Sequence, residues 1–246
     1  MDKANPVLDT ILFDLDGTLL QFSQDEFMNA YLAKLRGVFS RLGMDADKSI
    51  DAVWAGTKAM MLNDGAGLNS HRFWVKFAEK LDLSDVQCKA VEAACDDFYR
   101  NDFDSVKSIL GPNDISKKLV HALSAKGYGV VLATNPLFPE CAVETRLKWI
   151  GLAPGDFLLV THYANSAFCK PNHGYFREVL SKIGKSPENC FMAGNNPVED
   201  MSAGGFGIET YLVTDCLDNE YGVDISGFRQ GTLAELAELL MSFPCL

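Results

Sequence analysis

The amino-acid sequence predicts an α/β fold, in which a doubly wound parallel sheet carries an inserted all-helical block. Short apolar runs alternate with helical patterns from about residue 105 to residue 213. Another apolar run lies near the N-terminus, and residues 21–104 between the two show helical spacing without a convincing strand. We therefore expect an α/β core domain formed by residues 1–20 and 105–246, and a helical domain formed by residues 21–104.

The first half of the chain predicts one strand followed by four helices. Residues 7–13 form a continuous apolar run that ends in an acidic cluster, which is typical of a buried parallel strand. Ser23 and Glu26 form a capping-box pattern, and apolar residues then follow at helical spacing until Gly43. Further helices are expected over residues 47–62, 71–81 and 85–99.

The second half predicts alternating helices and strands. Helices are expected over 115–126, 139–150, 172–183 and 198–205, and strands over 128–134, 157–161, 190–194 and 210–213. Gly127 and Gly151 follow the first two helices, where glycine commonly ends a helix. No linker rich in serine and glycine separates the two parts of the chain, so the helical block is interpreted as an insertion after the first strand.

Composition narrows the classes of partner. The formal net charge of −11 would repel a polyanion such as nucleic acid. Seven cysteines without a C-x-x-C pair favour a reducing compartment over a disulfide framework. No apolar run approaches the roughly 18 residues that a membrane helix needs, and the N-terminus lacks a signal-peptide pattern. We expect a cytoplasmic protein without nucleic-acid or membrane partners, either a monomer or a homodimer.

Two carboxylates follow the first predicted strand. Asp14 and Asp16 lie at its carboxyl end, where parallel sheets bind ligands. One carboxylate can attack a phosphorus atom while the other protonates the leaving oxygen and later activates water. A hard cation such as Mg²⁺ would relieve their repulsion of a phosphate, and Gly17 would let the backbone turn closely around it. Taken alone, the same residues could form an ordinary solvated turn.

Four segments together resemble the haloacid dehalogenase superfamily. Asp14-Leu15-Asp16-Gly17-Thr18 matches its first motif, DxDGT, and Thr134 at the end of an apolar strand matches the second. Lys170 beside Pro171 matches the third, and the segment from Gly194 to Asp200 approximates the acidic fourth. The motifs occur in the family's order across the whole predicted core.

The resemblance implies a Mg²⁺-dependent phosphomonoesterase that hydrolyses a small phosphorylated metabolite through an aspartyl-phosphate. It also implies a helical cap of the C1 type over the site. The implied residues fall into three groups. The catalytic residues are Asp14, Asp16, Thr134 and Lys170; the phosphate is bound by Gly17, Thr18 and Asn135; the metal is held by Asp14, the backbone carbonyl of Asp16, Asn195 and Asp200.

Two positions decide between branches of the family. Dehalogenases replace the second acid, so Asp16 favours a phosphatase or a phosphomutase, and the phosphomutase remains an alternative. Asn195 stands where the family usually has a metal-binding aspartate. An amide oxygen can bind Mg²⁺ without adding charge. We therefore expect weaker metal binding, and a non-catalytic binding protein remains the other alternative.

Candidate substrate contacts in the helical block follow the glycine-rich loop 64–67. They are Asn69, His71, Arg72 and Trp74. Arg72 is expected to bind a second anionic group of the substrate. The alternative is a solvated surface arginine.

Overall fold

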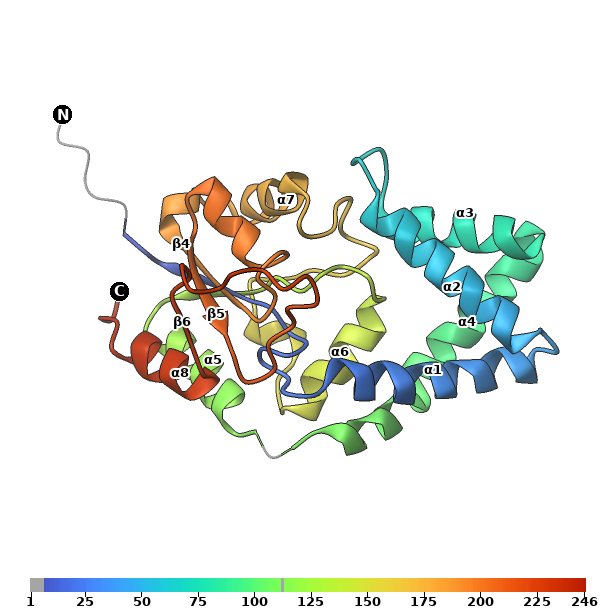
Figure 1. The fold of residues 1–246 in the computed structure, drawn as a ribbon, viewed down its shortest axis with the longest axis horizontal. Coiled ribbons are helices and arrows are strands. Elements are labelled where there is room, and N and C mark those ends of the chain that lie inside the picture. The colour runs from blue at the N-terminus through green and yellow to red at the C-terminus, as the bar shows by residue number, and fades with distance from the viewer. Residues whose placement is uncertain (1–6, 112) are drawn as a thin grey trace.

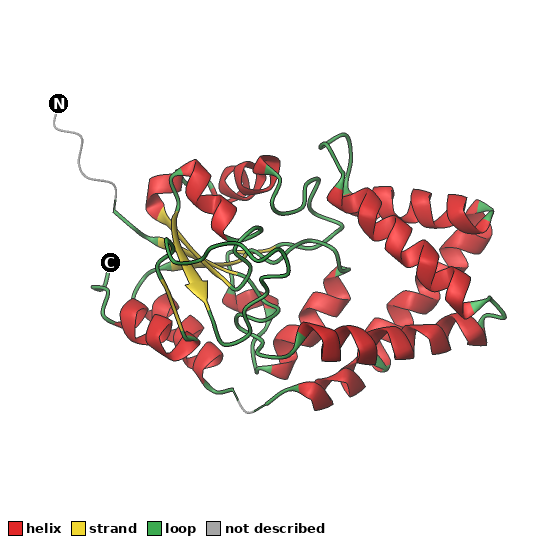
Figure 2. Cartoon of the chain, viewed as in Figure 1, coloured by secondary structure: helices red, strands yellow, loops and turns green. Residues whose placement is uncertain are grey.

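The computed structural model describes residues 7–111 and 113–246, and in these residues six strands form one parallel sheet (Figures 1 and 2). The strand order is β3-β2-β1-β4-β5-β6. The strands are β1 (Thr10–Phe13), β2 (Gly129–Leu132), β3 (Leu159–Val160), β4 (Cys190–Gly194), β5 (Glu209–Val213) and β6 (Gln230–Gly231). This confirms the predicted fold class. Residues 1–6 of the predicted core segment lie outside the described part.

Strand β1 lies at the centre of the sheet and aligns the loops that follow its two neighbours. Phe13 pairs with Leu132 of β2 on one side and with Ala193 of β4 on the other. The three strands therefore end at nearly the same level. Asp14, Thr134 and Asn195 consequently emerge next to one another at the carboxyl edge.

Helices cover both faces of the sheet, which explains why the central strands are apolar throughout. Helices α5 (Ile115–Ala125) and α8 (Leu233–Met241) pack with Ile11, Phe13 and Val130 on one face. Helix α7 (His173–Ile183) packs with Leu12 and Val131 on the other. Helix α6 (Glu140–Trp149) follows the loop after β2 and joins the first of these clusters.

The inserted segment is helical, as expected. It contains α1 (Gln24–Arg41), α2 (Ala46–Met61), α3 (Asn69–Leu81) and α4 (Asp85–Asn101), followed by a 3₁₀ helix, Phe103–Ile109. The four α-helices lie together beyond one edge of the core (Figure 1). The hydroxyl of Ser23 accepts from the Glu26 N–H at 3.5 Å and begins α1, and Ser84 and Gln87 form a reciprocal capping box at α4.

Several element boundaries differ from the sequence-based expectations. Strand β1 begins at Thr10 rather than at residue 7. The helix expected over 198–205 is instead a 3₁₀ helix, Met201–Phe206, which starts only after Asp200 has turned its side chain back to the Asn196 backbone N–H. Strand β6 and helix α8 were not predicted. A signal for α8 was present, because Thr232 and Glu235 form a capping box before an apolar segment.

Across the described residues, we find no helix with both the length and the apolar character that membrane spanning requires.

Candidate active site

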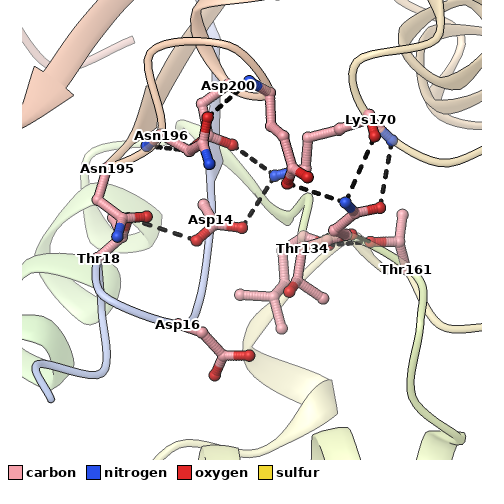
Figure 3. Close-up of polar contacts among 12 residues, drawn as sticks. Asp14, Asp16, Thr18, Thr134, Thr161, Lys170, Asn195, Asn196 and Asp200 are labelled. Carbon is pink, nitrogen blue, oxygen red and sulfur yellow. Dashed lines mark hydrogen bonds and ion pairs between the residues drawn. The ribbon is translucent and has the colours of Figure 1, made fainter. Parts of the chain in front are cut away.

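A buried lysine joins two carboxylates at the carboxyl edge of the sheet (Figure 3). Lys170 Nζ lies 2.9 Å from Asp14 Oδ1 and 2.5 Å from Asp200 Oδ1. Lys170 and Asp200 are each 1% exposed, and Asp14 is 6% exposed. Ion pairs in so dry a setting are only weakly screened by solvent. The three residues come from separate loops, so the fold assembles this charged group.

A threonine hydroxyl lies close to both the second carboxylate oxygen of Asp14 and the side-chain oxygen of Asn195. The Thr18 hydroxyl lies 3.4 Å from both Asp14 Oδ2 and Asn195 Oδ1. Asn195 Nδ2 donates to the Cys216 carbonyl at 2.7 Å, which fixes the orientation of the amide and leaves its oxygen next to Thr18. Gly17 is required beneath it, because a Cβ there would lie 2.0 Å from Asn195 Nδ2 and because its φ is +81°.

Asp200 is held by two donors. Its Oδ1 accepts from Lys170, and its Oδ2 accepts from the Asn196 backbone N–H at 2.9 Å. Gly194 lies directly against this carboxylate, since a Cβ at Gly194 would come 2.2 Å from Asp200 Cγ. Asp200 therefore positions Lys170, whereas the amide oxygen of Asn195 lies next to the Thr18 hydroxyl, which also contacts Asp14. The metal-binding role expected of Asp200 stays a prediction.

Asn135 connects the second and third motifs. Its side-chain oxygen accepts from the Lys170 backbone N–H at 3.2 Å, and its Nδ2 donates to Glu199 Oε2 at 2.8 Å. The neighbouring Thr134 is 3% exposed, and its backbone carbonyl accepts from the Thr161 hydroxyl at 2.7 Å. These bonds fix the loop that carries the predicted phosphate-binding groups.

Asp16 points away from the Lys170 group (Figure 3), and its ion pair with Arg146 directs it toward helix α6. Its Oδ2 forms an ion pair with Arg146 Nη1, and Arg146 is completely buried with its guanidinium 4.3 Å from the Phe138 ring centre. Within the described residues, Asp16 Oδ1 and Arg146 Nη2 are buried without a hydrogen-bond partner. Such unpaired buried polar atoms mark a site of function or strain.

Sequence reasoning missed Arg146. A signal was present, because Arg146 is spaced four residues from both Ala142 and Ile150 on the predicted apolar face of a core helix. A buried arginine needs a counter-charge. That requirement could have pointed to an acid of the site as its partner.

Burial and charge act together on the ionisable groups. Burial raises the pKa of Asp14 to about 7; Lys170 opposes this rise, and the negative charge of Asp200 adds to it. Burial acts to lower the pKa of Lys170, yet Asp14 and Asp200 overcome it and raise that pKa above its ordinary value. The site thus holds a charged lysine beside a nucleophile candidate that would become more acidic next to a further cation.

The oxygen donors at Asp14 suit a hard cation. In the described residues, no three side chains of His, Cys, Asp or Glu are grouped to hold a metal ion. What the site offers instead is one carboxylate oxygen, Asp14 Oδ2, and one amide oxygen, Asn195 Oδ1, each 3.4 Å from the Thr18 hydroxyl. Mg²⁺ accepts such oxygen ligands and keeps several waters. These two oxygen donors therefore fit Mg²⁺, although only one of them, the Asp14 carboxylate, carries a negative charge.

A cavity of about 1100 Å³ reaches the site at Gly17 and Asn195. Helices α1 to α4 and the loop 215–220 line it, and Trp74 is one of the lining residues. Arg72 is not: its guanidinium forms an ion pair with Asp64 at 2.8 Å, and its side chain is 39% exposed. Asn69 is buried and donates to the Phe168 and Pro136 carbonyls, so it ties α3 to the core loops. Neither Arg72 nor Asn69 contacts the charged group of Asp14, Lys170 and Asp200.

Comparisons with known proteins agree with this geometry. The family model for haloacid dehalogenase-like hydrolases matches residues 8–205. No curated protein gave a significant sequence match.

Three solved structures share the fold. A HAD phosphatase from Thermococcus onnurineus is 19% identical with a TM-score of 0.60, covering 97% of this chain and 100% of that one. A predicted phosphoglycolate phosphatase from Haemophilus somnus is 18% identical with a TM-score of 0.57, covering 94% and 97%. A β-phosphoglucomutase from Clostridium difficile is 13% identical with a TM-score of 0.57, covering 96% and 97%.

The family match spans most of the chain, from the loop before β1 through the 3₁₀ helix after Asp200, and thus includes Asp14, Thr134, Lys170 and Asn195. The resemblance inferred from the four motifs is confirmed. The chain belongs to the haloacid dehalogenase-like hydrolases.

Proposed function

We propose that this hydrolase is a phosphomonoesterase that acts on a small phosphorylated metabolite, with Asp14 as the nucleophile. The contact between buried Lys170 and Asp14, at 2.9 Å, carries the proposal. A lysine in this position holds a carboxylate in place and stabilises the negative charge that develops during phosphoryl transfer. A second acid, Asp16, lies two residues further on the same loop, as proton transfer to a leaving alcohol requires.

The proposed reaction has two steps. A carboxylate oxygen of Asp14 forms a bond to phosphorus while the bond from phosphorus to the leaving oxygen breaks, and Asp16 gives that oxygen its proton. Asp16 then takes a proton from water, whose oxygen attacks phosphorus and breaks the bond to Asp14. The products are the alcohol and inorganic phosphate. Thr134 and the Asn135 backbone N–H would bind phosphoryl oxygens during both steps.

Mg²⁺ is part of the proposal. Asp14 Oδ2, the Asp16 backbone carbonyl and Asn195 Oδ1 would hold it, and it would neutralise negative charge on the bound phosphoryl group. The excess of buried acids over cations around Asp14 supports this assignment. Since only one side-chain ligand is charged, we expect a weakly held ion that EDTA removes readily.

The first test is Asp14→Asn, assayed with 4-nitrophenyl phosphate and Mg²⁺. We expect turnover to fall by roughly 10³-fold or more, because the variant lacks the nucleophile, while far-UV circular dichroism is unchanged. Asp97→Asn is the matched control, because Asp97 is an exposed residue of α4. Retention of a tenth of the activity in Asp14→Asn, with no deamidation detected by mass spectrometry, would overturn the assignment of the nucleophile.

Product analysis separates the phosphomutase alternative. A phosphomonoesterase releases inorganic phosphate in proportion to substrate lost, whereas a phosphomutase returns the phosphoryl group to a sugar. We expect stoichiometric phosphate release. A complete absence of Mg²⁺-dependent turnover across a panel of phosphorylated metabolites would instead favour the non-catalytic binding protein.

A further inference from the structure

The cavity beside the active site is larger than a phosphoryl group needs. Its volume of about 1100 Å³ is at the upper end for small-molecule pockets. It meets the site at Gly17 and Asn195 and extends between the core and helices α1 to α4. If the proposed phosphoryl transfer takes place at Asp14, the remainder of the substrate occupies this space. The chemistry of the residues that line the cavity therefore indicates which class of leaving group the substrate carries.

The wall is mainly aromatic and apolar. Tyr31, Phe73, Trp74, Tyr99 and Phe138 all line the cavity. They come from α1, α3, α4 and the loop before α6, so rings approach the space from several sides. Tyr31 and Phe138 contact each other edge to face at 5.5 Å, and Phe73 and Trp74 do so at 5.0 Å. Such rings favour a bulky apolar or aromatic group.

The charged side chains of the cavity wall are all negative. Among the described residues, every charged side chain that lines the cavity is acidic: Asp25, Asp96, Asp215, Asp218 and Glu220. No Lys, Arg or His of the described residues lines it. The buried cations nearby are already paired, Lys170 with Asp14 and Asp200, and Arg146 with Asp16. Arg72, the sequence-based candidate for a second anion, pairs with Asp64 away from the cavity.

A second anionic group on the substrate would therefore lie in an apolar space without a counter-charge and among carboxylates. Both effects oppose its binding. A positively charged group on the substrate would be bound favourably, because carboxylates and aromatic faces both attract cations. Asp96 stands close to this aromatic wall, on the same turn of α4 as Tyr99.

We propose that the substrate is a phosphomonoester of a bulky aromatic or apolar alcohol that carries no second anion, and that a cationic substituent strengthens its binding. This rests on the proposed phosphomonoesterase function and specifies its substrate class. It excludes bisphosphates and phosphorylated small acids, such as phosphoglycolate, as good substrates.

Three aryl phosphates test the charge preference: 4-ethylphenyl phosphate, 4-(2-aminoethyl)phenyl phosphate and 4-(2-carboxyethyl)phenyl phosphate. Their charges lie two carbons from the ring, so the leaving phenols have similar reactivity. We expect kcat/KM to be highest for the cationic ester and about tenfold lower for the anionic than for the neutral ester. An anionic ester equal to or better than the neutral one overturns the proposal.

A pair of alkyl esters tests the apolar preference. The phenyl group of 2-phenylethyl phosphate should raise kcat/KM by about tenfold over ethyl phosphate, chiefly through a lower KM. Equal values for the two esters would overturn this part. Asp96→Asn should lower kcat/KM for the cationic ester more than for the neutral ester, so that the advantage of the cationic ester falls. Asp97→Asn, at the neighbouring residue outside the cavity lining, should alter neither.

Binding measurements separate this proposal from the proposed function. The three matching non-hydrolysable phosphonates are titrated calorimetrically into the wild-type protein with Mg²⁺. The same order of affinities is expected whether or not any ester is turned over. If no ester is turned over but the phosphonates bind in this order, the phosphatase function is rejected and the charge preference of the cavity stands. If the anionic phosphonate binds most tightly and the cationic one most weakly, the charge preference is rejected.

Discussion

The side chain of Asn195 has two functional ends: an oxygen that is the expected metal ligand, and an N–H group that forms a structural hydrogen bond. Its oxygen lies 3.4 Å from the Thr18 hydroxyl, which also contacts Asp14, and its Nδ2 donates to the Cys216 carbonyl at 2.7 Å. In Asn195→Asp, an added charge should tighten the apparent Mg²⁺ affinity in activity titrations. The same change places a carboxylate oxygen against the Cys216 carbonyl, so the free energy of unfolding measured in urea without Mg²⁺ should fall by about 1–3 kcal/mol.

Asn189→Asp is the matched control for that variant. Asn189 Nδ2 also donates to a backbone carbonyl, that of Val7, at 2.9 Å, but it lies away from the site. The control should lose some stability and keep the Mg²⁺ requirement of the wild type. A Mg²⁺ affinity in Asn195→Asp that is unchanged or weaker would place residue 195 outside the metal's ligands.

Arg146 is expected to act on the reaction by positioning Asp16. Proton donation matters most for a poor leaving group, so Arg146→Met should lower kcat by about 10²-fold or more with 2-phenylethyl phosphate. With 4-nitrophenyl phosphate, whose leaving group needs no proton, the loss should be several-fold smaller. Arg146→Lys should restore part of the rate on the alkyl ester.

The double variant distinguishes positioning from a general structural effect. If Arg146 acts through Asp16, then Arg146→Met combined with Asp16→Asn should be no slower on the alkyl ester than Asp16→Asn alone. Equal losses on both esters in Arg146→Met would mean that the arginine only stabilises the fold.

At the scale of the elements, close packing of α2 against α3 depends on one glycine. A Cβ at Gly56 would lie 2.6 Å from the Phe73 ring, whereas a Cβ at Gly37 in α1 would meet nothing closer than Arg41 Nη1 at 3.8 Å. Gly37→Ala should therefore stabilise the protein by about 0.5–1 kcal/mol, because alanine favours the helix.

Gly56→Ala has the same helix-propensity gain and should nevertheless destabilise the protein, by about 1–3 kcal/mol, because Phe73 must move. Chemical denaturation of both variants measures the change in the free energy of unfolding, which should be positive for Gly37→Ala and negative for Gly56→Ala. A Gly56→Ala protein as stable as Gly37→Ala would show that α3 shifts freely. The cavity wall formed by Phe73 would then be adaptable.

The elements themselves were predicted to different extents. Helices with strong caps and long apolar stripes, such as α4, were placed within two residues of their observed ends. Strand β6 has only two residues, so it has no apolar run that could signal it. It forms because β5 offers an unpaired edge to Gln230 and Gly231. Pairing of that kind depends on the neighbouring strand and not on local sequence.

At the scale of the whole molecule, one buried cluster joins the helical block to the sheet. Phe103 is fully buried and its ring lies 6.3 Å from Phe27 of α1, 5.8 Å from Phe98 of α4 and 5.2 Å from Trp149 of α6. Shared packing of this kind couples the stability of the two parts. We expect a single cooperative unfolding transition, with calorimetric and van't Hoff enthalpies in agreement.

Phe103→Ala tests the coupling. It should cost about 3–5 kcal/mol, since it removes a large side chain from a dense aromatic cluster. Val86→Ala on the exposed surface of α4 is the control and should be nearly neutral. Two separate transitions in the wild-type protein would contradict the expected coupling and would show that residues 21–104 unfold as an independent domain.

The fold class and the family could both be predicted from the order of the residues along the chain. Both depend on local features: apolar runs of strand length, helical spacing, Asp14, Thr134 and Asn195 at strand ends, and Lys170 near a helix start. A parallel sheet brings the first three of these residues together, because its strands end at one edge. Lys170 lies in the loop between β3 and α7, so its contact with Asp14 depends on the course of that loop.

The pairing of the remaining charges and the composition of the cavity wall depend on how the elements pack together. Arg146 meets Asp16, 130 positions earlier in the chain, and Arg72 meets Asp64 instead of the site. Which partner a charged side chain finds depends on burial and on helix orientation, and neither is visible in residue spacing. The acidic and aromatic cavity wall likewise comes from segments that are far apart in the sequence. The wall exists only once packing has brought their side chains to one surface.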